Sequence, residues 1–500
     1  MQSIYRPSLA TLTDLYQLTM GAAYHATGRE KDEAVFHLFF RRPPFGSGFT
    51  LAAGLAVVVE YLTQFRFSPE DLGYLAGLRG VDSAPLFTTD YLQTLAALEP
   101  GLGLDIDAVP EGTVVFPYEP LLRVQGSLLA AQIVETALLN MINFPTLVAT
   151  NAARVVLAAG GAPVLEFGLR RAQGPDGALT ASRAAYIGGA AATSNVLAGR
   201  LFGIPVKGTH AHSWVLSFPT EQEAFDAWAS AEPHNSILLV DTYDTLTGVR
   251  HAIVTGRKLR AAGHDLGGIR LDSGDLAYLS REARRMLDEA GFTKAQIVAS
   301  NDLDPDTIAS LREEGAEIDV WGVGTRLVTA YDEPALGGVY KLAAVRGPGG
   351  GPWRRTVKIS ADAAKTTVPG ILGVRRFVDD SGLAAADMIY DTLAEGPPGM
   401  MVVDPTNSHR RKVVDPDWTS EELLRPVFRD GELVAPVPSI EEARAHARAE
   451  INRFHPAILR RVNPHRYPAG LEIGIFRERE ALVEQAAERG AIVAPMEAQP

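Results

Sequence analysis

Residues 160–325 repeat one pattern, in which a short apolar run ends in small polar residues and a helical stretch follows. The ends of the runs lie roughly 20–40 residues apart, which is the length of a βα unit. The apolar runs are 163–167, 204–207, 237–240, 266–271, 297–299 and 318–323. Consecutive parallel βα units predict a doubly wound sheet or a (β/α) barrel.

Polar side chains follow nearly every one of these runs. In both architectures ligands bind at the edge where the parallel strands end. The polar segments are 166–171, 208–213, 241–244, 272–275, 300–302 and 322–325. Their coincidence with the strand ends indicates an enzyme.

Two of these segments suit a phosphorylated ligand. In Gly322-Val323-Gly324-Thr325 the glycines would let backbone N–H groups approach a phosphate, with a helix end behind them, although a plain tight turn explains the same residues. Asp272-Ser273-Gly274-Asp275, with Arg270 before it, would hold Mg²⁺ through water or bind a ribose diol. The alternative is that Asp272 or Ser273 caps the next helix.

His210 and His212 stand two residues apart, so in an extended segment both would point to one face. Three interpretations remain open at this point. The pair could bind a metal, although no third ligand is evident. His212 could act as a nucleophile or general base, because a neutral imidazole works near pH 7. Either ring could also be structural.

Aromatic rings and charges stand together at two places, Phe167 with Arg170 and Arg171, and Tyr16 with Asp14. A flat, anionic aromatic ligand would suit them, because a ring stacks on a ring and a guanidinium binds a carboxylate. Alternatively, the rings belong to the core and the arginines form surface ion pairs.

The composition allows a sizeable core, since 46% of the 500 residues are hydrophobic and 21% are charged. The net charge of −13 disfavours a dedicated nucleic-acid binder. A local basic pocket remains possible, and the pair Arg41-Arg42 would either reach a polyphosphate or form a solvated turn.

Cysteine is absent, which excludes disulfides, Cys-ligated zinc and thiol catalysis. The first residues show no basic region followed by an apolar run, so no signal peptide is expected. The longest uncharged apolar stretch, 155–165, is too short to cross a bilayer. We expect a cytoplasmic protein with no membrane partner.

Seven motifs, in order, resemble those of nicotinate phosphoribosyltransferases. They are 13–20 (TDLYQLTM), 42–49 (RPPFGSGF), 166–173 (EFGLRRAQ), 208–213 (GTHAHS), 269–276 (IRLDSGDL), 322–325 (GVGT) and 337–342 (GGVYKL). The resemblance implies an α/β fold of the type II phosphoribosyltransferase kind, an irregular (β/α) barrel. It further implies an N-terminal α+β domain over 1–150 that later segments complete, a barrel with the active site over 151–345, and a Gly-rich loop and C-terminal region over 346–500 that packs on the first domain.

The activity that the resemblance implies is the transfer of a phosphoribosyl group to nicotinate. The substrates would be nicotinate and 5-phosphoribosyl 1-diphosphate, and the products nicotinate mononucleotide and pyrophosphate, in NAD salvage. Mg²⁺ would be the cofactor and ATP a co-substrate, and the enzyme would be a homodimer. The resemblance does not decide which residues bind the metal.

Site residues follow from the resemblance by position. His212 would be the phosphorylated histidine, with Asp241 orienting it or binding Mg²⁺. The nicotinate contacts would be Tyr16, Phe167, Arg170, Thr209 and Arg270. The phosphoribosyl donor would contact Asp272 and Ser273, with Gly322, Gly324 and Thr325 at its 5-phosphate.

One position departs from the family pattern, because Ala192 stands where a glycine is expected. The neighbouring Thr193, Ser194 and Asn195 are uncharged. Since relatives that use nicotinamide carry an acidic residue there, this favours nicotinate. The alternatives are a nicotinamide or quinolinate phosphoribosyltransferase, an unrelated phosphate-binding barrel such as an aldolase using Lys207, and a non-catalytic sensor.

Overall fold

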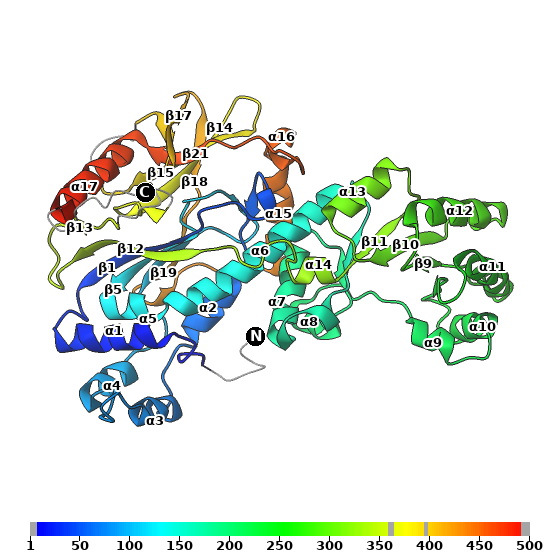
Figure 1. Cartoon of the computed structure of the whole chain (residues 1–500), viewed down its shortest axis with the longest axis horizontal. Helices are drawn as coiled ribbons and strands as arrows, with labels where there is room; N and C mark the ends of the chain where they lie inside the picture. The colour runs from blue at the N-terminus through cyan, green and yellow to red at the C-terminus, as the bar shows by residue number, and fades with distance from the viewer. Residues whose placement is uncertain (1–7, 359–364, 395–398, 492–500) are drawn as a thin grey trace, which may run out of the picture. The chain divides into compact units, whose positions relative to one another are not determined.

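The repeat of strands and helices lies within Leu147–Pro334, one of two compact units of the chain. Met1–Thr146 and Ala335–Pro500 together form the other unit. This computed structural model describes residues 8–358, 365–394 and 399–491 (Figure 1).

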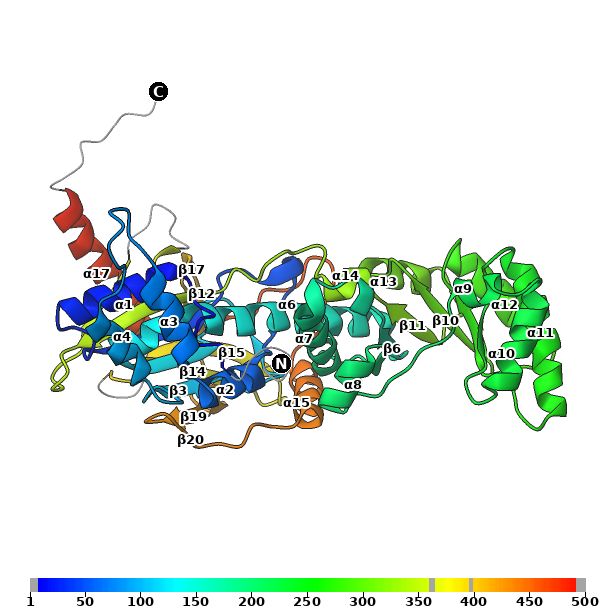
Figure 2. The ribbon, with the colours of Figure 1, turned by 90° about the horizontal axis from the view of Figure 1, so that it is seen from below.

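The unit Leu147–Pro334 is built on a parallel sheet with the strand order β7-β6-β11-β10-β9-β8. The strands are β6 (Val164–Glu166), β7 (Ala192–Thr193), β8 (Ile237–Leu239), β9 (Gly268–Leu271), β10 (Gln296–Asn301) and β11 (Val320–Val323). Its helices are the end of α6 (Glu135–Ala159), η3 (Leu169–Arg171), α7 (Gly174–Ile187), α8 (Val196–Phe202), α9 (His212–Leu216), α10 (Glu221–Ala231), α11 (Thr245–Ala261), α12 (Leu276–Glu289), α13 (Pro305–Glu313) and α14 (Thr325–Val328). Helices α11 and α12 flank strands β9 and β10 (Figures 1 and 2).

The pairing of β11 with β6 joins the last strand of the repeat to the first, as in a barrel. Among the described residues, however, no hydrogen-bonded pairing connects β7 with β8, so the barrel is open there. A single bridge between Thr193 and Val206 is all that remains of the strand predicted over 204–207. That prediction is wrong, and the other five apolar runs contain strands.

Alternation along β9 explains how this sheet carries polar side chains. Ile269 and Leu271 are fully buried on one face, while Arg270 between them is half-buried on the other. Helix α12 covers the sheet with an apolar stripe of Leu276, Ala283 and Leu287.

The other unit contains a seven-stranded sheet, a six-stranded sheet and a two-stranded pair. Their strand orders are β13-β12-β1-β5-β3-β19-β20, β17-β16-β21-β15-β14-β18 and β2-β4. The first half of the chain supplies β1 (Glu33–Phe39), β2 (Thr50–Leu51), β3 (Asp105–Ala108), β4 (Val114–Val115) and β5 (Leu122–Ser127). The second half supplies β12 (Val339–Arg346), β13 (Arg354–Arg355), β14 (Leu372–Val378), β15 (Ala384–Asp391), β16 (Met401–Asp404), β17 (Asn407–Val413), β18 (Thr419–Glu422), β19 (Arg425–Arg429), β20 (Glu432–Leu433) and β21 (Ala469–Glu472). Since β1 lies between β5 and β12, the seven-stranded sheet needs both halves.

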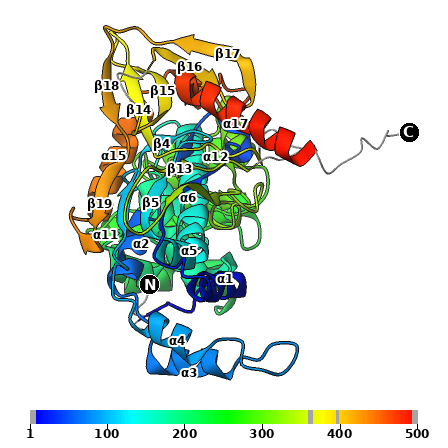
Figure 3. The same ribbon diagram turned by 90° about the vertical axis from the view of Figure 1, so that its left-hand side faces the viewer.

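Helices surround these sheets. They are α1 (Leu15–Ala26), η2 (Pro44–Gly46), α2 (Leu55–Thr63), α3 (Pro69–Gly77), α4 (Thr89–Ala96), α5 (Leu128–Ile133), the start of α6, α15 (Ile440–Asn452), α16 (Pro456–Leu459) and α17 (Ile473–Ala491). Helix α17 lies against β16 and β21 of the six-stranded sheet (Figure 3).

Among the described residues, helix α6 alone is long and apolar enough to cross a membrane, as judged by its length and composition. In its most apolar window 67% of the residues are buried within the protein, as in a core helix of a globular protein.

Candidate active site

The carboxyl ends of β8, β9 and β10 bring three predicted polar segments together. The strands pair in parallel, with Leu239 opposite Arg270 and Ala299 opposite Leu271. Asp241 follows β8, Asp272 follows β9, and Ser300 lies near the end of β10. The prediction that these strand ends meet at one edge is confirmed.

Arg270 is held by three oxygen atoms. Its Nη2 donates to Asp272 Oδ1 at 2.9 Å and its Nε to Ser300 Oγ at 2.8 Å. Its Nη1 donates to Thr209 Oγ1 at 3.3 Å. Ser300 in turn donates to Asp272 Oδ1 at 2.5 Å. These bonds fix the plane of a guanidinium whose side chain is only 15% exposed, which prepares it to bind a planar anion such as a carboxylate.

Asp241 holds the turn after β9. Its Oδ2 accepts hydrogen bonds from the backbone N–H of Asp272 at 2.9 Å and from Ser273 Oγ at 2.6 Å. Its Oδ1 is buried and has no hydrogen-bond partner among the described residues. An unsatisfied buried carboxylate oxygen is costly and indicates a ligand at that position.

His212, the first residue of α9, faces both carboxylates. Its Nε2 lies 3.7 Å from Asp272 Oδ2 and 4.0 Å from Asp241 Oδ1. Its Nδ1 lies 3.1 Å from Thr242 Oγ1. The side chain is 41% exposed, so a substrate can reach it. This geometry suits a nucleophile or base whose ring is oriented by a hydroxyl group.

His210 has a different environment, and the prediction that both histidines point to one face is wrong. Its ring is buried against Trp228, with the centroids 5.0 Å apart. Its Nε2 accepts a hydrogen bond from the backbone N–H of Leu239 in β8 at 3.2 Å. Burial lowers the pKa of His210 to about 4, so the ring is neutral. The structural interpretation therefore applies to His210.

Phe167 forms an aromatic surface beside Arg270. The guanidinium carbon of Arg270 lies 5.7 Å from the centre of the Phe167 ring. A Cβ at Gly322 would come within 2.8 Å of this ring, so only glycine fits there. Thr325 begins α14, which has four residues, so the expected helix end behind this turn is a single helical turn.

Asp272 and Ser273 do not cap α12, so that alternative is wrong. The cap is Asp275, whose side chain accepts from the backbone N–H of Tyr278 at 3.0 Å. Gly274 makes the turn possible with a φ of +80°. Asp272 is thereby left to face His212.

Two predicted nicotinate contacts take no part in the hydrogen bonds of this cluster among the described residues. Arg170 is exposed on η3 and has no ion pair with any described residue. Tyr16 belongs to the other unit, on α1, and its side chain is 46% exposed. Burial and the nearby Glu135 raise the pKa of Tyr16 to about 12, so the phenol keeps its proton.

Ala192 fits its place without strain, since it lies in β7 opposite Leu165 and has no positive φ. The next residue donates from Thr193 Oγ1 to the buried Glu166 Oε2 at 2.5 Å. Asn195 Nδ2 donates to Ser182 Oγ at 3.2 Å within the same network. Of the three uncharged residues, Ser194 is therefore the one whose side chain remains available to a ligand.

Sequence reasoning did not single out Thr242, Ser300 or Glu166. All three stand in strand-end segments, where a hydroxyl residue such as Thr242 or Ser300 carries no specific signal. No group of three His, Asp or Glu side chains that could hold a metal occurs in the described part of the chain. Asp241 and Asp272 are the carboxylates that the cluster offers to a cation.

Comparisons with known proteins show the family of this chain. A family model described as the nicotinate phosphoribosyltransferase N-terminal domain matches residues 11–143, and its C-terminal domain matches residues 373–477. The nicotinate phosphoribosyltransferase of Bacillus subtilis (strain 168) is 42% identical over 469 residues, covering 93% of each chain. The human nicotinate phosphoribosyltransferase is 38% identical, covering 91% of this chain and 93% of its own.

Solved structures show the same fold. The crystal structure of human nicotinic acid phosphoribosyltransferase matches with a TM-score of 0.80 at 35% identity, covering 94% of this chain and 99% of that chain. A nicotinate-nucleotide pyrophosphorylase from Pyrococcus furiosus matches with a TM-score of 0.67 at 23% identity, covering 89% of this chain and 95% of that chain. The fold class that the resemblance implies is thereby confirmed.

Proposed function

The chain belongs to the nicotinate phosphoribosyltransferase family, and on that premise we propose that it joins nicotinate to 5-phosphoribosyl 1-diphosphate with ATP coupled to the reaction through a phosphohistidine at His212. The products are nicotinate mononucleotide and pyrophosphate. The observation that carries this proposal is the meeting of His212, Asp241 and Asp272 with the oriented Arg270 at one sheet edge.

Nicotinate binds between an aromatic ring and a cation in this proposal. Phe167 supplies the ring, and Arg270 binds the carboxylate with help from Thr209. The pyridine nitrogen is already a nucleophile, so no strong base is needed, and positioning provides much of the rate. Tyr16 covers the other face of the ring, as the resemblance implies.

Asp272 binds the ribose hydroxyls through its exposed oxygen. Its other oxygen is occupied by Ser300 and Arg270, so the carboxylate is already oriented before substrate arrives. The 5-phosphate binds the backbone at Gly322, Gly324 and Thr325, where Phe167 leaves no room for side chains at Gly322.

His212 accepts a phosphoryl group at Nε2. In the tautomer with the proton on Nδ1, this N–H donates to Thr242 Oγ1, and the Nε2 lone pair is free to attack the terminal phosphorus of ATP. The new Nε2–P bond replaces the P–O bond to ADP, and water later hydrolyses the phosphohistidine. The negative phosphoryl group then lies near Asp241 and Asp272, so a cation is needed to offset the repulsion.

The two carboxylates fit Mg²⁺. Asp241 Oδ1 is a buried acceptor with no partner in the described part of the chain, and Asp272 Oδ2 lies on the same side of His212. Mg²⁺ in enzymes is often held by one or two carboxylates together with substrate phosphates. When bound, Mg²⁺ neutralises charge on the phosphates and on the leaving pyrophosphate.

We also propose that the protein is a homodimer. Helix α8 exposes Val196, Leu197 and Leu201, and Val206 beside them is 45% exposed. A contiguous apolar group of this kind is typical of a protein interface. Analytical ultracentrifugation tests this directly, and a monomer at micromolar concentration would contradict it.

One assay tests the reaction. The purified protein is incubated with Mg²⁺, 5-phosphoribosyl 1-diphosphate and either nicotinate, nicotinamide or quinolinate, with and without ATP, and the nucleotides are separated by chromatography. Of the three bases, we expect only nicotinate to give a mononucleotide, and we expect ATP to increase its yield. Product formed from nicotinamide or quinolinate instead would identify that base as the substrate. The absence of product from all three bases would favour a non-catalytic sensor.

A pair of histidine variants tests the phosphohistidine. His212→Ala is expected to abolish ATP hydrolysis while slow, ATP-independent transfer continues. His234→Ala, an exposed histidine outside the cluster, is the control and should retain both. Undiminished ATP hydrolysis in His212→Ala would remove that residue from its role.

A further inference from the structure

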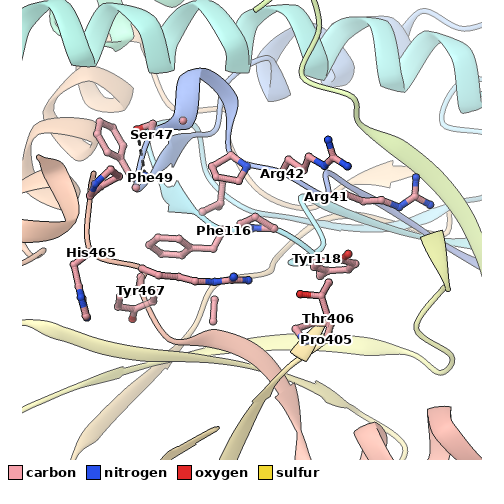
Figure 4. A pocket seen from close by; sticks show the side chains of 18 residues that line it. Arg41, Arg42, Ser47, Phe49, Phe116, Tyr118, Pro405, Thr406, His465 and Tyr467 are labelled. Carbon is pink, nitrogen blue, oxygen red and sulfur yellow. Dashed lines mark hydrogen bonds between the residues drawn. The ribbon is translucent and has the colours of Figure 1, made fainter. Parts of the chain in front are cut away.

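A cavity of about 540 Å³ opens in the unit formed by Met1–Thr146 and Ala335–Pro500, and all its lining residues belong to that unit. This volume is typical of sites for small molecules. Figure 4 shows two different ends: Phe49, Phe116, His465 and Tyr467 gather at one, and Arg41, Arg42, Tyr118 and Thr406 at the other. None of the residues assigned to the proposed reaction lines this cavity.

The aromatic end is rigid. The rings of Phe116 and Tyr467 stack with centroids 4.2 Å apart, and Phe454 packs against both. The Tyr467 hydroxyl donates to the buried Asp387 at 2.8 Å, which fixes the ring. A fixed apolar wall of this kind favours a flat ligand group, because little side-chain freedom is lost on binding.

The other end carries positive charge that is only partly compensated, since Arg466 pairs with Asp404. Arg41, Arg42 and Arg466 line the cavity, and no aspartate or glutamate does. The Nε of Arg41 is buried without a hydrogen-bond partner among the described residues. Arg42 is exposed and forms no ion pair in the described part of the chain. In a chain with a net charge of −13, such a group indicates an anionic ligand.

A second cavity, of about 410 Å³, adjoins the first and shares Arg466 and Tyr467 with it. Its remaining basic residues are Arg410, Arg411 and Lys412 of β17, with His409 beside them. Asp404 is the one carboxylate that lines it, and it pairs with Arg466 at 2.9 Å and Arg410 at 3.5 Å. Asp404 thus orients two arginines while neutralising one charge.

We propose that these adjoining cavities bind a nucleoside polyphosphate. The base lies against the aromatic end, and the phosphates contact Arg466 and Arg42. Arginine binds phosphate oxygens through two parallel N–H groups, which suits a diphosphate or triphosphate. Because the cations of the second cavity adjoin Arg466, a ligand with one phosphate would leave most of the charge without a partner.

Photolabelling of the full-length protein with 8-azido-ATP tests this proposal, with the labelled peptides identified by mass spectrometry. We expect label on peptides that contain residues 43–49 or 464–469. ATP and ADP should compete, and AMP and adenosine should compete more weakly. Saturating 5-phosphoribosyl 1-diphosphate and nicotinate should leave this label in place, whatever the fate of ATP at His212.

Two variants locate the phosphates. Arg466→Ala and Arg42→Ala should each reduce the label at least about tenfold, since each removes a charge-assisted hydrogen bond. Arg42→Ala has no partner to lose among the described residues, so it remains informative if Arg466→Ala is unstable. Arg448→Ala, an exposed arginine on α15, is the matched control and should label normally.

Three results would overturn the proposal. One is the absence of label from these peptides. Another is its removal by 5-phosphoribosyl 1-diphosphate, which would make the cavity part of the catalytic site. The third is equal labelling of wild type, Arg42→Ala and Arg466→Ala. Failure of the nicotinate reaction itself would leave this test unaffected.

Discussion

Replacing Ser300 by alanine removes one oxygen atom that contacts both charged groups of the candidate site. Ser300 Oγ donates to Asp272 Oδ1 at 2.5 Å and accepts from Arg270 Nε at 2.8 Å. The residue is 4% exposed, so solvent has little access to the space left behind. Asp272 keeps its bond from Arg270 Nη2, but Arg270 Nε loses its partner.

The expected cost follows from these contacts. A hydrogen bond to a charged group contributes about 1.5–3 kcal/mol. The Asp272 side chain is 26% exposed, so water can replace part of the hydrogen bond that it loses from Ser300. The Arg270 side chain is only 15% exposed, so water replaces less of the bond lost at its Nε. A net loss of about 2–3 kcal/mol in transition-state binding corresponds to a decrease of roughly 30- to 150-fold in kcat/KM.

Initial rates at varied nicotinate and saturating 5-phosphoribosyl 1-diphosphate measure this decrease, and we expect it mainly as a higher KM for nicotinate. Ser236→Ala is the matched control. Ser236 is also 4% exposed, and its hydroxyl donates to Asp265 O at 2.9 Å, but it precedes β8 at the opposite end of the sheet. It should lower the melting temperature and leave kcat/KM within about twofold. A Ser300→Ala enzyme with wild-type kcat/KM, or equal losses in both variants, would refute the reasoning.

Three further variants test other parts of the structure. Thr242→Val should slow ATP hydrolysis about three- to tenfold, because one hydrogen bond to His212 is lost. The ATP-independent transfer should be unchanged, and Thr245→Val is the control. The pKa of His210 is about 4 in the folded protein, and its ordinary value is 6.5. Between these two values the unfolded chain binds a proton that the folded protein does not. The free energy of unfolding should therefore fall by about 3 kcal/mol as the pH drops from about 6.5 to 4. In melting curves the His210→Gln variant should lose this pH-dependent part of the stability. The same pH dependence of the melting temperature in the variant and the wild type would contradict the prediction. Arg376→Met should destabilise the protein by about 3–5 kcal/mol in urea unfolding, since it leaves the buried Asp387 without its arginine and removes one of the two arginines that pair with Glu450. The exposed Arg448→Met should have little effect.

Five of the six apolar runs predicted as strands are strands, because each is a local run of apolar residues ended by turn residues. The strand β7 was missed, since Ala192–Thr193 has no strand pattern of its own. It forms because its two residues pair in parallel with Leu165 and Glu166 of β6. Pairing of this kind depends on residues distant in sequence, which periodicity does not detect.

The candidate site was predictable to a similar extent. Strand ends that carry Asp241, Asp272 and Arg270 are visible in the sequence, and parallel pairing brings them together. The contacts of Ser300 and Thr242 are not visible, because a small hydroxyl residue becomes specific only when another strand places a charged group beside it.

The two histidines show how the open barrel separates identical residues into different roles. Because no strand in the described part of the chain pairs with the free edge of β8, the N–H of Leu239 needs an acceptor from elsewhere, and His210 provides it. The segment that carries His210 is then a loop rather than a strand, and helix α9 begins at His212. An extended segment would have turned both rings to one face, whereas this geometry buries His210 and leaves His212 facing Asp241 and Asp272. The gap in the barrel therefore leaves His212 exposed beside the two carboxylates, and a variant that disrupts the His210–Leu239 contact should displace His212.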